Sequence, residues 1–406
     1  MNPEGMAMGA AAFERGRLAR LGEVMAGHVE RGEVAGLAWA VARGGEAHTG
    51  VAGTLDAGRD APVKRDTIFR ISSMTKPVTA VAALVLLEEC AIRLDEPVDR
   101  LLPELADRLV LATPGGPLDE TVPARRAITV RDLLTFRMGL GMDFAAWERQ
   151  TVLGAMAEMD IGAGPPAPAV PPEPDEWMRR LSTLPLEHQP GERWLYHTSA
   201  DVLGVLVARA AGQRLDDVLR ERVFEPLGMV DTGFSVPTAD TGRFGPCYGT
   251  DPASGARTVY DPADGQWSRP PAFPGGGAGL VSTVDDYLAF AAMLAGGGTA
   301  GGTRIMSRPS VEAMTMNHLT AEQLASGPDP EGAQGWGFGV GVRVRATGPV
   351  HRAGTYGWDG GLGSSWANDP AEGVVGVILT NQMWTSPSPP PVCQDFWTCA
   401  YAALDG

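Results

Sequence analysis

The 406-residue sequence has few cysteines, no long apolar run and no excess of basic side chains. Its four cysteines show no Cys-x-x-Cys spacing, so we expect no cysteine-bound metal and predict small buried thiols in a reducing compartment. No apolar run reaches the roughly 18 residues that a membrane-spanning helix needs. The net charge of −16, from 33 basic and 49 acidic side chains, disfavours nucleic acid and anionic membranes as partners.

The sequence also lacks two recognisable motifs, a signal peptide and the nucleophile elbow of one hydrolase class. The N-terminal residues 1–20 lack an apolar core behind a basic start, which predicts no signal peptide and a cytoplasmic protein. The chain contains no Gly-x-Ser-x-Gly, so the nucleophile elbow of the α/β-hydrolases is not expected. A hydrophobic content of 44% is that of an ordinary globular protein. The length allows one large domain or two that pack together, and we expect a monomer or a homodimer.

Hydrophobic periodicity predicts that both ends of the chain contribute to one sheet with terminal helices packed on it. The elements expected there are a helix over 13–29, strands over 37–41 and 46–51 joined by a turn at 43–45, strands over 339–345 and 373–380, and a helix over 392–404. The middle of the chain has helical spacing instead, over 80–89, 130–135, 200–211, 215–223 and 284–294.

The expected organisation is therefore discontinuous. Residues 1–72 and 300–406 would form an α/β sheet domain, and residues 73–299 a mostly helical domain inserted between its two halves. The proline-rich run 164–174 is expected to be an extended or disordered surface loop.

Ser73 and Lys76 form the most informative pair of residues in the chain. Their Ser-x-x-Lys spacing places both side chains on one face if the segment is helical, so that the amine can take the hydroxyl proton and leave a serine able to attack a carbonyl. The β-prone residues 67–71 precede them and an apolar helix over 78–89 follows, which puts Ser73 in the first turn after a strand. There the helix dipole favours anions. On this motif alone, a capping serine beside a solvated lysine remains an alternative.

Two other segments could complete a site. Tyr196 precedes the helix expected over 200–211, and a phenol held near an ammonium loses its proton well below its usual pKa, so it could serve as general base and acid. The glycine-rich segment 357–366 could form another strand of the sheet, where glycines allow a substrate to approach and a backbone N–H can stabilise an oxyanion. Taken singly, the tyrosine could be a packing residue and the glycines a hairpin.

In this order, the three elements resemble the serine hydrolases of the class C β-lactamase and penicillin-binding-protein superfamily, and most closely its family VIII carboxylesterases. The resemblance spans residues 13–383 and includes the supporting stretches 128–135, 224–229 and 278–283. It implies a β-lactamase/transpeptidase-like fold of the α/β (α+β) class. In this fold an antiparallel sheet is flanked by terminal helices, and the active site lies between the sheet and the inserted helical domain.

The resemblance also implies roles for individual residues. Ser73 is the expected nucleophile, Lys76 helps to deprotonate it, and Tyr196 is the shared base that later protonates the leaving group. The backbone N–H groups of Ser73 and Gly361 are the expected oxyanion hole. The implied reaction is two-step acyl transfer from a small-molecule ester through an acyl-enzyme on Ser73, without a cofactor or metal.

The chain departs from the β-lactamase pattern at two places. Thr198 stands where the second β-lactamase motif ends in Asn, and Trp358-Asp359-Gly360 replaces Lys-Thr-Gly. All four residues are candidates for substrate binding. Trp358 cannot bind the carboxylate of a β-lactam, and Asp359 would repel it if the side chain faces the site rather than solvent. We therefore expect neutral esters to be preferred and β-lactams to be poor substrates.

Other candidates carry less weight. His197 is a candidate for the pocket rim rather than for the base, His351 is expected to be structural or exposed, and replacing either histidine is expected to leave most activity. Aromatic and apolar residues could line an acyl pocket or belong to the core; they are Phe136, Met138, Trp147, Trp336 and Phe338.

Three alternatives to an esterase remain open. The first is a β-lactamase or D-amino-acid peptidase, which Thr198 and Trp358 disfavour. The second is a biosynthetic acyltransferase that uses the same acyl-enzyme with an alcohol acceptor in place of water. The third is a catalytically inactive binding protein on this fold, which the joint presence of Ser73, Lys76 and Tyr196 disfavours.

Overall fold

A single antiparallel sheet organises the molecule. The computed structural model describes residues 13–58, 60–146, 150–162, 164–325, 327–329 and 331–404. Within these ranges the main sheet has the strand order β11-β12-β13-β14-β15-β1-β2. Its strands are β1 (Gly36–Arg43), β2 (Glu46–Gly53), β11 (Gln334–Trp336), β12 (Gly341–Arg343), β13 (Tyr356–Gly360), β14 (Ser364–Asp369) and β15 (Val374–Thr380). β1 pairs with β15, which confirms the prediction that both chain ends build one sheet.

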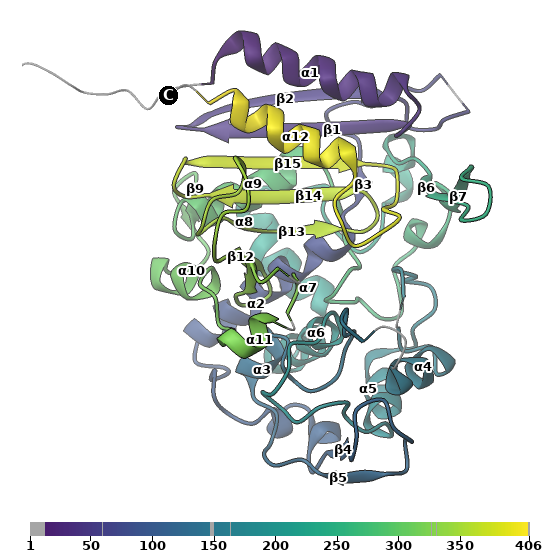
Figure 1. Cartoon of the computed structure of the whole chain (residues 1–406), viewed down its shortest axis with the longest axis vertical. Coiled ribbons are helices and arrows are strands. Elements are labelled where there is room, and N and C mark those ends of the chain that lie inside the picture. The colour runs from purple at the N-terminus through teal and green to yellow at the C-terminus, as the bar shows by residue number, and fades with distance from the viewer. Residues whose placement is uncertain are drawn as a thin grey trace, which may run out of the picture.

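The two faces of the sheet pack against different helices because successive side chains of a strand point to opposite sides. Trp39 of β1 belongs to a core that α1 (Arg15–Glu30) and α12 (Pro391–Ala402) cover. Ala40 faces the opposite side, in the larger core shared with α9 (Val284–Ala295). Figure 1 shows the two terminal helices side by side across the strands. The helical part of the chain lies beyond the edge of the sheet that is opposite to β2.

The remaining elements lie mostly between the two halves of the sheet in sequence. The helices are α2 (Thr75–Glu88), α3 (Val130–Leu134), α4 (Thr151–Glu158), α5 (Pro174–Ser182), α6 (Thr198–Ala211), α7 (Leu215–Leu219), α8 (Glu225–Leu227), α10 (Arg308–Met314) and α11 (Ala321–Ala325). Two-stranded sheets pair β3 (Phe69–Arg70) with β8 (Val281–Ser282), β4 (Leu109–Leu111) with β5 (Thr121–Pro123), β6 (Cys247–Thr250) with β7 (Arg257–Asp261), and β9 (Thr299–Ala300) with β10 (Thr303–Arg304).

Local sequence explains the two helices that frame the site. α2 is apolar on all sides, as a central helix must be, and its residues from Thr75 to Leu86 are buried. α6 ends at Gly212, whose φ of 66° is the left-handed conformation that a glycine adopts most readily at a helix end.

Several sequence expectations needed correction. Segment 357–366 is not one strand but a hairpin, β13 and β14, which turns at Gly361–Gly363. The helix expected over 215–223 ends at Leu219 and continues as a π-helical turn over Arg220–Phe224. The proline-rich run lies at the surface as expected, with Pro168 as its one buried residue, and the Tyr260 hydroxyl donates to the Pro166 carbonyl at 2.7 Å. In the described part of the chain, no helix has the length and apolar character needed to cross a bilayer.

Candidate active site

Ser73 lies at the strand-to-helix junction that the sequence predicts. It sits in a short 3₁₀ turn, η1 (Ser72–Met74), between β3 and α2. Ser72 has a φ of 46°, a left-handed conformation that side-chain-bearing residues adopt at a cost of about 1–2 kcal/mol. The turn is fixed at Ile71, whose N–H donates to the Leu280 carbonyl at 3.1 Å and whose carbonyl accepts from Ser364 Oγ at 3.0 Å. The nucleophile is therefore presented by a strained and tethered turn.

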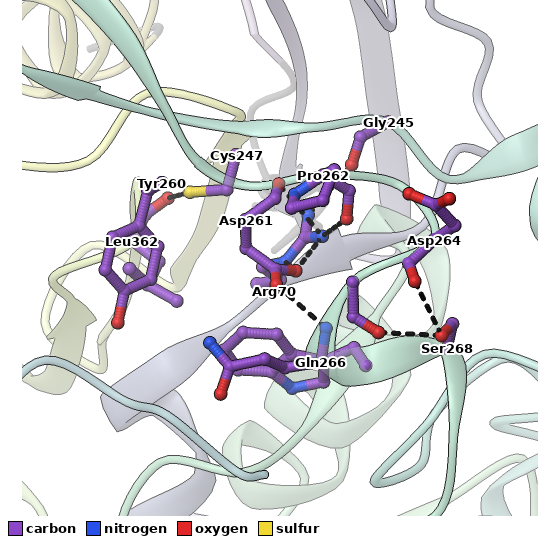
Figure 2. A network of polar contacts seen from close by, with 12 residues as sticks. Arg70, Gly245, Cys247, Tyr260, Asp261, Pro262, Asp264, Gln266, Ser268 and Leu362 are labelled. Carbon is purple, nitrogen blue, oxygen red and sulfur yellow. Dashed lines mark hydrogen bonds and ion pairs between the residues drawn. The ribbon is translucent and has the colours of Figure 1, made fainter. Parts of the chain in front are cut away.

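A buried ion pair holds the strand that leads to this turn. Arg70 of β3 donates to the Asp261 carboxylate through Nε at 3.0 Å and Nη2 at 2.5 Å, and both side chains are almost fully buried. Its Nη1 also reaches the Gly245 carbonyl at 2.8 Å, and the guanidinium lies 4.0 Å from the ring centroid of Phe244. Figure 2 shows the polar contacts of Arg70 with its neighbours Asp261 and Gly245. This network fixes the position of β3 and hence of Ser73.

Ser73, Lys76 and Tyr196 come together as the sequence predicts. The Nζ atom of Lys76 donates to Ser73 Oγ at 3.0 Å, and the hydroxyl groups of Ser73 and Tyr196 are hydrogen-bonded to each other. The ammonium group also lies 4.5 Å from the centroid of the Tyr196 ring. Ser73 and Tyr196 retain 9% exposure each, whereas Lys76 retains only 1%. The hydroxyl groups face the site while the amine is enclosed behind them.

Burial sets the protonation of both bases. The pKa of Lys76 falls to about 7, because burial disfavours the ammonium more than the carboxylate of Asp201 stabilises it. The pKa of Tyr196 is raised, chiefly by burial, although its hydrogen bonds with Ser73 and Trp358 oppose the shift. The expectation of a phenolate was therefore wrong: the ammonium faces the ring rather than the oxygen. Near pH 7 the tyrosine is therefore neutral, and the lysine is divided between its neutral and its protonated form.

A tight turn before α6 directs two neighbouring side chains to the same amine. His197 has φ 80° and ψ −68°, and the Thr198 N–H donates to the Tyr196 carbonyl at 3.2 Å, which together define a strained γ-turn. As a result, the Tyr196 ring and His197 Nδ1 both contact Lys76, the latter at 3.2 Å from Nζ.

Lys76 closes a ring of hydrogen bonds with three other groups. Its Nζ donates to the Gly277 carbonyl at 2.6 Å, and the Gly277 N–H donates to Asp201 Oδ1 at 2.8 Å. Asp201 Oδ2 lies 3.1 Å from His197 Nε2, and His197 Nδ1 completes the ring at Lys76. A side chain on Gly277 would collide with this ring, since an added Cβ would lie 2.9 Å from Asp201 Oδ1.

Sequence reasoning missed Asp201 and Gly277. One signal was available for the aspartate: it follows His197 by four positions at the start of α6, a spacing that places both residues on one helix face. No comparable signal existed for Gly277, which belongs to a loop far away in sequence.

The sheet side of the site is formed by β13. Trp358 Nε1 donates to the Tyr196 hydroxyl at 2.7 Å. Gly360 lets the strand approach the Ser73 turn, because an added Cβ would lie 2.3 Å from the Ile71 carbonyl oxygen. Gly361 begins the hairpin turn, and its carbonyl accepts from the Trp384 N–H at 2.9 Å, which orients the adjacent peptide.

Asp359 lies away from these groups. Strand alternation turns it to the opposite face from Trp358, where it pairs in register with Ser365 and lines a small cavity with Trp397 of α12. Burial raises its pKa to about 6. The side chain is half-buried and faces away from the site, so of the two expected orientations only the one toward the site is wrong, and Asp359 is not part of the proposed substrate site.

The aromatic candidates support the site from behind. Phe136 and Trp336 are fully buried, and their ring centroids lie 6.1 and 6.4 Å from that of Tyr196. Thr198, Met138 and Phe338 are buried as well, and Trp147 lies outside the described residues. His351 packs against Trp397 and Tyr401 under α12, and burial lowers its pKa to about 4.

A cavity of ≈ 230 Å³ adjoins the hydrogen-bonded ring. His197, Asp201 and Ala278 line it on the site side, and the proline-rich run lines it on the other. Trp177 and Phe273, stacked at 5.0 Å between centroids, form an aromatic wall. The described residues contain no cluster of side chains suited to holding a metal ion.

Comparison with known proteins supports the family that the sequence motifs resemble. The Beta-lactamase family model matches residues 21–390. An uncharacterized protein of Mycobacterium tuberculosis is 39% identical over 363 residues, which covers 87% of this chain and 84% of that protein. Esterase EstB of Burkholderia gladioli is 32% identical over 412 residues, or 96% of each chain.

The fold agrees with that of a solved enzyme. EstCE1, described as a hydrolase with promiscuous acyltransferase activity, superposes with a TM-score of 0.76 at 25% sequence identity, covering 95% of this chain and 99% of that one. The β-lactamase/transpeptidase-like fold expected from the sequence is thereby confirmed. The chain belongs to the beta-lactamase family.

Proposed function

We propose that this protein is a serine carboxylesterase that cleaves small, uncharged carboxylic esters through an acyl-enzyme on Ser73. The observation that carries the proposal is the 3.0 Å contact between Ser73 Oγ and the buried Nζ of Lys76, beside the Tyr196 hydroxyl. The 32% identity to Esterase EstB supports ester cleavage as the reaction.

Neutral Lys76 is the base for acylation in this proposal. It takes the Ser73 proton while Oγ forms a bond to the ester carbonyl carbon. The tetrahedral oxyanion would accept hydrogen bonds from the backbone N–H groups of Ser73 and Gly361. Its collapse breaks the bond to the ester oxygen, which takes a proton from Tyr196. A water molecule that enters as the alcohol leaves then carries the extra proton of Lys76 to the Tyr196 phenolate. Water then repeats the sequence on the acyl-enzyme and regenerates Ser73.

The walls of the adjoining cavity indicate the preferred substrate. Trp177, Phe273 and the proline-rich run offer apolar surface, and Asp201 contributes a negative charge. The pKa of Asp201 is lowered: His197, Lys76 and the Gly277 amide outweigh the effect of burial, so it stays ionised at neutral pH. An apolar substituent of the ester fits this environment, and a carboxylate would be repelled. We therefore retain the prediction that β-lactams are poor substrates.

Acyl transfer to an alcohol is the second candidate function. It uses the same acyl-enzyme, with an alcohol oxygen in place of water as the attacking atom. The description of EstCE1 as a hydrolase with promiscuous acyltransferase activity favours testing it.

We also propose a cytoplasmic location and a monomeric or homodimeric state. All four cysteines are free thiols, which supports a reducing compartment. Cys247 and Cys393 are buried as predicted, whereas Cys90 is exposed and Cys399 half-buried, so the prediction of buried thiols was wrong for these two.

Mass spectrometry of the acyl-enzyme tests the proposal. After brief mixing with p-nitrophenyl butyrate, we expect a butyryl group on the peptide that contains Ser73, and none in S73A. Adding a primary alcohol distinguishes the two candidate reactions, because a transferase forms the new butyrate ester faster than butyrate. A butyryl group on another residue would refute the proposal.

A further inference from the structure

The buried ring around Lys76 fixes where the hydrogens of the amine point. Nζ has three polar neighbours, namely the Gly277 carbonyl at 2.6 Å, His197 Nδ1 at 3.2 Å and Ser73 Oγ at 3.0 Å. A carbonyl oxygen can only accept a hydrogen bond. One N–H of the amine therefore always points to Gly277.

Asp201 fixes which nitrogen of His197 carries the hydrogen. The histidine is neutral because burial, and then the nearby Lys76, lower its pKa. A neutral imidazole has one donor nitrogen and one acceptor nitrogen. Nε2 faces the carboxylate of Asp201 at 3.1 Å and must be the donor, so Nδ1 is the acceptor and takes a second N–H from Lys76.

A neutral amine has only two N–H groups, and both are then occupied. We propose that His197 and Asp201 are positioning residues that direct the lone pair of neutral Lys76 toward Ser73 Oγ. This inference rests on the proposed role of Lys76 as the base. When the amine is protonated, the third N–H donates to Ser73 instead, so the same ring accommodates both forms without rearrangement.

The strained γ-turn at His197 supports this role. The positive φ of 80° is strained for a residue other than glycine, and it brings Nδ1 within hydrogen-bonding distance of Nζ. The inference predicts the opposite of the sequence-based expectation that replacing His197 would leave most activity. The titratable groups that face the amine are Ser73, Tyr196, His197 and Asp201.

The rate at which a neutral fluorophosphonate labels Ser73 tests the inference without knowledge of the substrate. Labelling measured from pH 5.5 to 9.5 reports the nucleophilicity of Ser73, and its final extent reports the folded fraction. We expect H197L, which removes the acceptor, to slow labelling about 10- to 100-fold, the effect of leaving one buried N–H of the amine without its acceptor. H197N can place an amide oxygen near the position of Nδ1 and should recover most of the rate.

Asp201→Asn should slow labelling and also move its acid limb to lower pH. The slower rate follows because an amide can donate to Nε2 and turn Nδ1 into a donor that opposes Lys76. The shift follows because the carboxylate of Asp201 raises the pKa of Lys76, and its loss lowers that pKa further.

His351 provides the matched control, since it is a histidine packed between Trp397 and Tyr401 on the opposite face of the sheet. H351L and H351N should keep the wild-type labelling rate and pH limb even if they unfold at lower temperature. A wild-type rate in H197L, or equal losses in H197L and H197N, would overturn the inference. Labelling of Ser73 without ester cleavage would instead refute the proposed function and leave this inference standing.

Discussion

The indole Nε1 of Trp358 and the hydroxyl of Tyr196 are 2.7 Å apart, and their hydrogen bond joins strand β13 to the segment that enters α6. The indole can only donate, so the phenol oxygen accepts and its own hydrogen is free to point toward Ser73 or a leaving group. The sheet therefore orients a side chain that the helical part of the molecule supplies.

Trp358→Phe should lower kcat about tenfold and change KM much less. The phenyl ring keeps most of the packing but leaves the buried Tyr196 oxygen without its donor, a loss of about 1–2 kcal/mol. Steady-state kinetics on p-nitrophenyl butyrate measures both constants. Trp397→Phe is the matched control, because its indole donates to Ser365 Oγ at 3.0 Å on the opposite face of the sheet. An equal effect of the two substitutions on kcat would contradict an orienting role for Trp358.

The pH dependence of kcat/KM should show an acid limb centred near pH 7. Lys76 acts only when neutral, and burial lowers its pKa to about 7, so activity rises as pH increases through that value. Stability changes in the same direction: the penalty for burying the amine is full below about pH 7 and fades as pH rises toward 10.5, the ordinary lysine pKa. A stopped assay from pH 5 to 10 checks the limb. A limb near pH 10 would show that the ordinary lysine pKa is retained.

Breaking the Arg70–Asp261 pair should destabilise the protein by about 3–5 kcal/mol. Arg70→Met leaves the carboxylate of Asp261 buried without a cation, and the loss should displace the turn that carries Ser73. Arg65→Met provides the control, since Arg65 forms a bidentate but exposed pair with Asp285 and such pairs contribute about 1 kcal/mol or less. Urea unfolding monitored by tryptophan fluorescence gives both values. Similar losses in the two variants would show that the buried network does not anchor β3.

Asp359→Asn should leave the ratio of ester to β-lactam turnover unchanged. The side chain lies on the face of the sheet opposite to Trp358, so it makes no contact with a substrate carboxylate at Ser73. Stability should respond instead. Because burial raises the pKa of Asp359 to about 6, the ionised carboxylate is destabilising, and the variant should gain on the order of 1–3 kcal/mol over wild type at pH 7. The gain should vanish below about pH 4. A rise in nitrocefin turnover would place Asp359 at the site after all.

The sequence predicted those features that depend on local pattern. The Ser73 and Lys76 spacing, the helical periodicity after them and the short apolar runs of β1 and β15 are all short-range signals, and the structure agrees with each. The Trp358 register could not be read in the same way. A glycine-rich segment hides its turn, and only the hairpin at Gly361–Gly363 shows which side chains face the site.

The protonation states of Lys76 and Tyr196 could not be predicted from the sequence, because they depend on burial and on contacts between distant segments. The Gly277 carbonyl reaches Lys76 from 201 positions away, and no local pattern signals that contact. No local pattern shows the orientation of Tyr196 either. Its ring, and not its hydroxyl oxygen, contacts the ammonium of Lys76. The sequence motifs alone suggested that a nearby ammonium lowers the pKa of Tyr196, whereas burial raises it.

The most direct test of the account compares wild type with Ser73→Ala on p-nitrophenyl butyrate and on nitrocefin. We expect rapid ester cleavage by wild type, little nitrocefin turnover, and no enzymatic cleavage of either compound by S73A. Fast nitrocefin turnover would contradict the preference for neutral esters, and ester cleavage that survives in S73A would show that Ser73 is not the nucleophile.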